Sequence, residues 1–336
     1  MKALVILGTR PELIKLYPVI KELKPIVVNT GQHKEMLDEV NKTLKVKFDY
    51  ELNAMSKTLT KLTARLHILI GRVLSVEKPD VVIVQGDTTT AMVAALEAFY
   101  LKIPVAHVEA GLRTDNIFAP FPEEANRRII TQVATYNFAP TDEASMAVFR
   151  DTGKFAEVMG NTVVDTLQEL IKGEVKTKKK VLVTIHRREN FVNIPTILDR
   201  LQAFIYKYPD WEIVVPVHLN PNVQKAFKVK LPSQIKKVKP FSYIEMIRQM
   251  RESAFIITDS GGIQEEAPSL GKRVLVVRED TERPEGLGIC SELVRPKELL
   301  EKMEELMDKK MTKIENPFGD GQAGRRIARF LCKELL

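Results

Sequence analysis

The sequence predicts an α/β protein with two Rossmann-like doubly wound domains that face a cleft. The chain has 336 residues, which is too long for one ordinary core and suits two domains of typical size. Short apolar runs alternate with helix-length amphipathic segments almost from end to end, which is the pattern of doubly wound α/β units. Polar motifs directly follow several of these runs in both halves, and ligands of open α/β sheets bind beyond the carboxyl ends of the strands. We therefore expect the ligand in the cleft between the domains.

Five short apolar runs in the first half are predicted strands, because strands buried on both faces of a parallel sheet have continuous apolar sequences. They are Ala3 to Leu7, Ile26 to Asn29, Val81 to Gln85, Val105 to Val108 and Asn137 to Ala139. Helical patterns lie between them, including Pro11 to Leu23 and Leu59 to Val76. The second half repeats the alternation, with predicted strands at Val181 to Ile185, Ile213 to Val217, Phe255 to Thr258 and Val274 to Val277.

The domain boundary is predicted near residues 161–180, where a helical pattern ends at Gly173 and a lysine-rich run follows. A last helix is predicted over Ala323 to Leu335, after a loop rich in Gly, Pro and Asn.

Composition and charge narrow the class of function. No apolar stretch approaches the ~20 residues that span a bilayer, and the first apolar run is too short for a signal peptide, so we expect a cytoplasmic protein without a membrane partner. Cys290 and Cys332 match no zinc or redox spacing. The net charge is +7, but the lysines are mostly spread along surface helices beside glutamates, without the basic stripe and interleaved aromatics of a nucleic-acid binder. A basic cleft for an anionic metabolite explains the charge equally well.

The segment from Thr258 to Glu266 carries the clearest ligand-binding pattern. A predicted strand ends at Thr258. The strand is followed by Ser260, Gly261 and Gly262, where a helix begins. Glycines let a ligand approach the backbone, and the free N–H groups at a helix start bind phosphate. Glu266 lies further along the helix, within reach of ribose hydroxyls. The alternative is a glycine-softened turn with a serine cap.

A second strand-to-helix turn, Gly8 to Glu12, has the same form. Pro11 suits the first helical turn, where no N–H is lost. Arg10 is expected to point into the cleft, with Lys15 further along the helix. The alternative is a capped helix with a surface arginine.

Acidic residues and one histidine are the candidates for chemistry. Asp87 and Glu109 follow buried-looking strands, where an acid is costly without a partner or a role. Glu123 and Glu124 open a predicted helix, with Arg127 and Arg128 one turn later, so an ordinary ion pair explains them equally well.

His186 ends the first strand of the second domain and precedes two arginines. A histidine there suits anion binding or proton donation, and a plain capping role is the alternative.

One apparent motif is rejected. Residues 319–324 match G-x-G-x-x-G by letter, but no apolar strand precedes them and too few residues follow for a βαβ unit. We therefore expect no nicotinamide cofactor, and no metal motif is present.

Taken together, the motifs resemble those of the non-hydrolysing UDP-N-acetylglucosamine 2-epimerases. Matching segments cover nearly the whole chain: Gly8 to Glu12, Gln85 to Thr90, His107 to Thr114, Phe121 to Arg127, Gly160 to Asp165, His186 to Asn190, Pro216 to Pro221, Asp259 to Gly271 and Thr281 to Glu285. The resemblance implies a glycosyltransferase-B-like fold, a homodimer, and conversion of UDP-N-acetylglucosamine to UDP-N-acetylmannosamine without nicotinamide or metal. By analogy the last helix crosses back onto the first domain. The first domain then comprises residues 1–165 with 321–336, and the second comprises residues 166–320.

The resemblance also implies roles for particular residues. The nucleotide would be held by Arg10, Lys15, Met246, Ser260, Gly261, Gly262, Glu266 and Arg283, with the uracil near Phe241 to Met246. Asp87, Glu109, Glu123 and His186 would serve the chemistry. Bacterial members bind a second substrate molecule as an activator, and the matching positions are Gln32, His33, Arg65 and His218. Glu35 stands where bacterial relatives tend to have glutamine.

Three alternatives remain for the same nucleotide cleft: a glycosyltransferase, a hydrolysing epimerase and a non-catalytic sugar-nucleotide sensor. The four candidate catalytic residues argue against the sensor.

Overall fold

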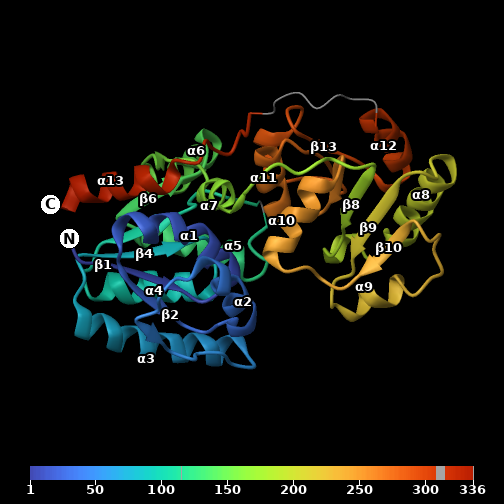
Figure 1. Cartoon of the computed structure of the whole chain (residues 1–336). Helices are drawn as coiled ribbons and strands as arrows, with labels where there is room; N and C mark the ends of the chain where they lie inside the picture. The colour runs from blue at the N-terminus through green and yellow to red at the C-terminus, as the bar shows by residue number, and fades with distance from the viewer. Residues whose placement is uncertain (115, 308–314, 336) are drawn as a thin grey trace. The chain divides into compact units, whose positions relative to one another are not determined.

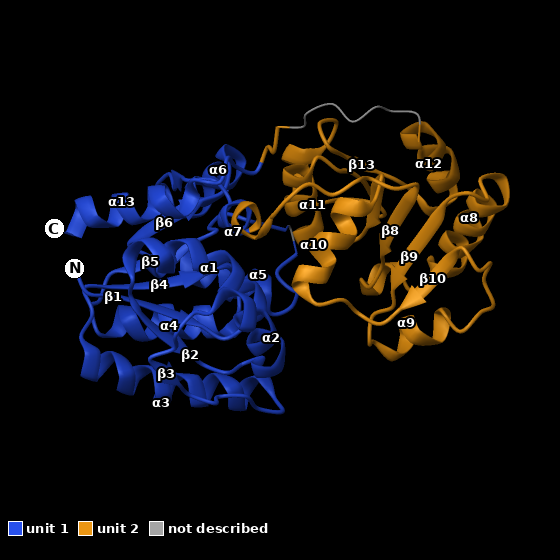
Figure 2. Ribbon diagram, viewed as in Figure 1, with its two compact units in different colours: residues 1–166, 318–336 blue, residues 167–317 orange. Residues whose placement is uncertain are grey.

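The computed structural model describes residues 1–114, 116–307 and 315–335 (Figure 1). The chain divides into two compact units, residues 1–166 with 318–336 (unit 1) and residues 167–317 (unit 2), which Figure 2 shows in two colours.

Unit 1 is built on a seven-stranded sheet in the order β3-β2-β1-β4-β5-β6-β7, in which every neighbouring pair is parallel. Its strands are β1 (Ala3–Leu7), β2 (Ile26–Asn29), β3 (Tyr50–Glu51), β4 (Val81–Gln85), β5 (Val105–Val108), β6 (Tyr136–Ala139) and β7 (Glu157–Val158). Its helices are α1 (Arg10–Leu23), α2 (Lys34–Leu44), α3 (Leu59–Glu77), α4 (Thr89–Tyr100), α5 (Glu123–Val133), α6 (Asp142–Thr152) and α13 (Ala323–Leu335), while α7 (Thr162–Leu170) runs across the boundary.

Both faces of the unit 1 sheet are buried. Leu4 and Ile6 pack into a core with α3 and α4, while Val5 and Leu7, which alternate with them along β1, are also fully buried. This double burial explains why β1 and β4 are continuous apolar runs.

Unit 2 is built on a six-stranded parallel sheet in the order β10-β9-β8-β11-β12-β13. Its strands are β8 (Lys180–Thr184), β9 (Glu212–Pro216), β10 (Ile235–Val238), β11 (Phe255–Thr258), β12 (Arg273–Val276) and β13 (Ser291–Leu293). Its helices are α8 (Ile194–Lys207), α9 (Pro221–Ala226), α10 (Tyr243–Glu252), α11 (Gly261–Glu266) and α12 (Leu299–Met307), with single 3₁₀ turns at Arg188–Asn190, Ala267–Leu270, Pro284–Gly286 and Pro296–Glu298.

The predicted fold class, two α/β domains with parallel sheets, is confirmed. The strands predicted in the first half match the structure to within one residue, and those of the second half begin and end one residue earlier or coincide. One local prediction is wrong, because the helix expected to end at Gly173 ends at Leu170. The helix expected at the glycines after β11 spans Gly261–Glu266, and Glu266 lies within it as expected.

The last two residues of the rejected G-x-G-x-x-G segment, Ala323 and Gly324, begin α13, and among the described residues no strand leads directly into the segment. Its last glycine has a packing role instead, since a Cβ on Gly324 would lie 2.9 Å from the carbonyl carbon of Pro18. Gly324 therefore lets α13 pack closely on α1. Among the described residues, no helix is long and apolar enough to cross a bilayer.

Candidate active site

The turn after β1 is organised by Glu12, which is fully buried. Its Oε2 accepts hydrogen bonds from Gly8 N (2.9 Å) and Thr9 Oγ1 (2.8 Å), and its Oε1 accepts one from Thr88 Oγ1 (2.6 Å). Burial raises the pKa of Glu12 to about 7, although these hydrogen bonds oppose the shift. Glu12 thus links the turn that carries Arg10 to the loop that follows β4.

Glu109 directly follows β5 and has a left-handed backbone with φ 66°. Such a conformation is uncommon for glutamate and marks a position that its surroundings must stabilise. The buried carboxylate contacts Lys15 Nζ through Oε1 and Gln85 Nε2 through Oε2. The predicted residues Lys15 and Glu109 are therefore brought together as an ion pair.

Asp87 lies two residues beyond β4, in a loop held from several sides. Its carboxylate forms an ion pair with Arg127 Nη2, and its backbone oxygen accepts a hydrogen bond from Asn126 Nδ2 (2.9 Å). The neighbouring Gly86 oxygen accepts a hydrogen bond from His107 Nε2 (2.8 Å). Burial lowers the pKa of His107 to about 4, so this ring is uncharged at neutral pH. Its hydrogen bond to the Gly86 oxygen helps to hold the loop that carries Asp87.

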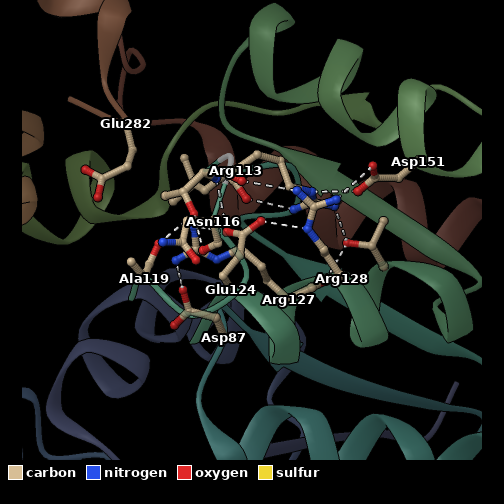
Figure 3. A network of polar contacts seen from close by, with 12 residues as sticks. Asp87, Arg113, Asn116, Ala119, Glu124, Arg127, Arg128, Asp151 and Glu282 are labelled. Carbon is tan, nitrogen blue, oxygen red and sulfur yellow. Dashed lines mark hydrogen bonds and ion pairs between the residues drawn. The ribbon is translucent and has the colours of Figure 1, made fainter. Parts of the chain in front are cut away.

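Glu123 and Glu124 begin α5 but have different surroundings. Glu124 is fully buried and paired with Arg127 and Arg128, which is the ordinary ion-pair alternative considered for this motif. Glu123 is half-buried and makes no hydrogen bond or ion pair to the described residues. Figure 3 shows Glu124 within a network that includes Arg127, Arg128 and Asp87. Of the two, Glu123 has its carboxylate available for a ligand.

In unit 2 the fully buried Asp259 joins the exits of β8 and β11. Its carboxylate accepts hydrogen bonds from His186 N (3.0 Å), Arg187 N (2.9 Å) and Asn190 Nδ2 (3.1 Å). His186 Nδ1 lies 3.2 Å from Asp259 Oδ1. Burial lowers the pKa of His186, although Asp259 opposes this shift. Burial therefore favours the neutral imidazole, whose Nδ1 is the ring nitrogen beside the Asp259 carboxylate.

The glycines after β11 lie against Arg283. A Cβ on Gly261 would lie 2.6 Å from Arg283 Cζ, whereas one on Gly262 would meet nothing within 4 Å. Arg283 Nε donates to the buried Glu265 (2.9 Å), and its Nη1 donates to Glu282 (3.1 Å). The predicted residues Gly261 and Arg283 are thus in contact.

Glu282 is surrounded by arginines. Besides Arg283 it pairs with Arg278 (2.7 Å) and Arg187 (3.5 Å), and these cations hold the pKa of its carboxyl far below the usual range despite burial. Three guanidinium groups are therefore gathered around one permanent anion, close to the start of α11.

Glu266 is the last residue of α11 and accepts a hydrogen bond from Tyr243 Oη (3.3 Å), at the first turn of α10. Met246 lies on the same helix and is half-buried. The structure therefore brings Glu266 to the segment expected to contact the base.

The positions matched to an activator site are spread over both units. Gln32 is buried and its Oε1 accepts hydrogen bonds from Thr90 N (3.1 Å) and Thr90 Oγ1 (2.7 Å). Burial lowers the pKa of His33. The exposed Arg65 donates to Asn53 O (2.9 Å), which leaves part of its guanidinium available.

His218 belongs to unit 2, where its ring stacks on His186 with centroids 5.4 Å apart. This contact places a predicted activator residue against a predicted catalytic one.

Comparisons with known proteins agree with these features. A family model described as UDP-N-acetylglucosamine 2-epimerase matches residues 20–332. The chain is similar to the UDP-N-acetylglucosamine 2-epimerase of Campylobacter jejuni, with 44% identity over 376 residues that cover 99% of this chain and 97% of the relative. It is also similar to the crystal structure of UDP-GlcNAc 2-epimerase from Neisseria meningitidis bound to UDP-GlcNAc, with a TM-score of 0.88, 40% identity and coverage of 99% and 100%.

A more distant structure, a glycotransferase of kitacinnamycin, has a TM-score of 0.64 at 13% identity and covers 99% of this chain and 98% of its own. At that identity the likeness shows the fold alone, which is glycosyltransferase-B-like.

Proposed function

The chain belongs to the UDP-N-acetylglucosamine 2-epimerase family, and on that premise we propose that it reversibly converts UDP-N-acetylglucosamine to UDP-N-acetylmannosamine without releasing the free sugar. One observation carries the proposal: two carboxylates, Asp87 and Glu109, stand at the exits of the paired strands β4 and β5, each held by its own cation. A reaction that removes and returns a proton on opposite faces of one carbon needs two such groups.

The substrate's chemistry explains why further groups are needed. The hydrogen on C2 of the sugar is not next to a carbonyl, so a carboxylate alone does not remove it. Departure of UDP from C1 gives the sugar oxocarbenium character, which makes that hydrogen acidic. The proposed route is elimination to UDP and 2-acetamidoglucal, followed by re-addition with a proton delivered to the other face.

The leaving diphosphate requires cations and N–H donors. We assign Arg283 and the backbone of Ser260, Gly261 and Gly262 to it, supported by the close contact of Arg283 with Gly261. Arg10 is a further donor in this proposal, since it makes no hydrogen bond to a described residue. Glu266 and the neighbouring Met246 are assigned to the nucleoside, and His186 Nε2 to the diphosphate, where it can take or give a proton.

The acid and base roles fall to unit 1. Glu109 is paired with Lys15 and buried, whereas Asp87 is more open and Glu123 has no polar partner among the described residues. As proposed, Asp87→Asn and Glu109→Gln each abolish epimerisation and retain UDP binding. Unchanged turnover in either variant removes that residue from the catalytic set.

The deciding experiment is incubation with UDP-N-acetylglucosamine in deuterated water, followed by proton NMR. Deuterium at C2 in two UDP-linked epimers supports the proposal. Free N-acetylmannosamine and UDP select the hydrolysing reaction, and an unchanged substrate favours a glycosyltransferase.

Two further properties follow from the family. We propose a homodimer, supported by exposed apolar side chains on the adjacent helices α3 and α4, namely Ile68, Val76, Phe99 and Tyr100, and tested by sedimentation. We also propose activation by a second substrate molecule at Arg65, His33 and Gln32. In the reverse direction, which starts from UDP-N-acetylmannosamine, trace UDP-N-acetylglucosamine then shortens the lag before turnover in wild type and not in Arg65→Ala.

A further inference from the structure

Arg127 on α5 is a buried arginine whose donors are only partly used. It is 7% exposed, and its Nη2 contacts the Asp87 carboxylate while its Nη1 lies 3.4 Å from Glu124 Oε2. Its Nε and Nη1 are enclosed and donate a hydrogen bond to no described group. An enclosed donor without a hydrogen bond costs about 1–3 kcal/mol, so the fold tolerates a cost to keep this guanidinium beside Asp87.

Glu124 holds Arg127 in that place. It is fully buried, and besides its ion pair with Arg127 it accepts hydrogen bonds from Thr114 N (3.1 Å) and Arg128 Nε (2.7 Å). Arg128 in turn forms an ion pair with Asp151 on α6, with 3.4 Å between Nη1 and Oδ1. The carboxylate of Glu124 therefore cannot swing away, and it presents Oε2 toward Arg127 (Figure 3).

This arrangement leaves Asp87 with one oxygen engaged and one available. Arg127 contacts Oδ2, and Oδ1 accepts no hydrogen bond from a described residue. A carboxylate that transfers a proton to or from carbon must be aimed within a fraction of an ångström, and misplacement by about 1 Å costs about 100-fold in rate. Arg127 supplies that aim, because its ion pair at Oδ2 restrains rotation of the Asp87 carboxylate and therefore the direction of Oδ1.

Resting on the function proposed above, we propose that Arg127 is a positioning residue that orients Asp87 for proton transfer at C2, and that Glu124 fixes Arg127 in turn. Arg127 does not bind substrate, because its free donors are enclosed by protein. It acts through Asp87 alone.

The test compares two neighbouring arginines of α5. Arg127→Ala removes the contact with Asp87, whereas Arg128→Ala removes an equal charge from Glu124 and leaves Asp87 untouched. The measurements are kcat and KM for epimerisation, deuterium incorporation at C2, UDP affinity and the circular dichroism of the folded protein.

We expect Arg127→Ala to lower kcat and the deuterium incorporation about 100-fold, with KM and UDP affinity within about threefold of wild type. Arg128→Ala stays within about tenfold in kcat. Guanidinium ion at millimolar concentration restores part of the activity of Arg127→Ala, and sodium ion at the same ionic strength does not. Arg127→Lys, which keeps the charge but loses the planar fork, has an intermediate kcat.

Three results overturn the inference. One is a kcat of Arg127→Ala within threefold of wild type. Another is an equal loss in both alanine variants, and the third is a folded Arg127→Lys with full activity. If Arg127→Ala does not fold, Arg127→Lys decides alone. Wild-type protein without any exchange at C2 refutes the proposed function instead.

Discussion

Replacing Glu12 with glutamine is expected to change how the stability of unit 1 depends on pH. Glutamine has the shape of the protonated acid: its oxygen can accept from Gly8 N, and its amide can donate to Thr88 Oγ1. The variant therefore keeps the hydrogen bonds that join the two loops and loses only the titration.

The sign follows from the direction of the pKa shift. Burial raises the pKa of Glu12 from 4.5 to about 7, so between these pH values the folded protein binds more protons than the unfolded chain. The stabilisation by the neutral acid is complete below pH 4.5 and is lost as the pH rises through 7. At 1.36 kcal/mol per pKa unit, the free energy of unfolding of wild type falls by about 2 to 3 kcal/mol relative to that of Glu12→Gln between about pH 5 and pH 8.

Urea unfolding measures this difference. Far-UV circular dichroism reports both units, while the single tryptophan, Trp211, lies in unit 2 and serves as an internal reference. Glu22→Gln, at an exposed position on the same helix α1, is the matched control and should leave the pH dependence unchanged. If the free energies of unfolding of wild type and Glu12→Gln differ by the same amount at every pH in this range, the predicted role of Glu12 is refuted.

Two further predictions concern unit 2 and use Trp211 fluorescence during urea unfolding. Asp259→Asn turns an NH₂ group toward donors that now meet a carboxylate, and it should lower the free energy of unfolding by about 2–3 kcal/mol; an unchanged midpoint would show that these hydrogen bonds contribute little. Gly261→Ala should cost about 1–2 kcal/mol more than Gly262→Ala, because only the first places a Cβ against Arg283; equal midpoints for the two variants would contradict it.

Strands that are central in each sheet were predictable from sequence, and edge strands were not. Val81–Gln85 is buried on both faces, so its sequence is a continuous apolar run. In contrast, β3 (Tyr50–Glu51), β7 (Glu157–Val158) and β13 (Ser291–Leu293) are two or three residues long. The edge strand β10 contains Lys236 and Lys237, as edge strands often do to discourage further pairing, so its sequence has no strand pattern.

The candidate site was predictable where a motif marks the end of a strand, as at Asp87, Glu109 and His186. Residues that act through partners distant in sequence were missed. Glu12 belongs to the predicted turn Gly8 to Glu12, but its hydrogen bond with Thr88 joins positions 76 residues apart, which no local pattern indicates. Glu124 and Glu123 are adjacent acids, and only burial distinguishes the one inside the network from the one beside it. At Glu12 the sequence signal is an acid among apolar residues of a buried helix, whereas the buried residues around Glu124 include Asn126 and Arg127 and give no such signal.

The return of α13 to α1 has a consequence for the order in which the chain folds during synthesis. The residues of unit 2 are translated before those of α13. Until then α1 lacks the helix that covers it. The carboxylate of Asp165 also lacks the hydrogen bonds that it accepts from Ala323 N and Gly324 N in the finished fold. Unit 1 is thus the first to be started and the last to be finished, and its uncovered helix is the surface that a nascent-chain chaperone would meet.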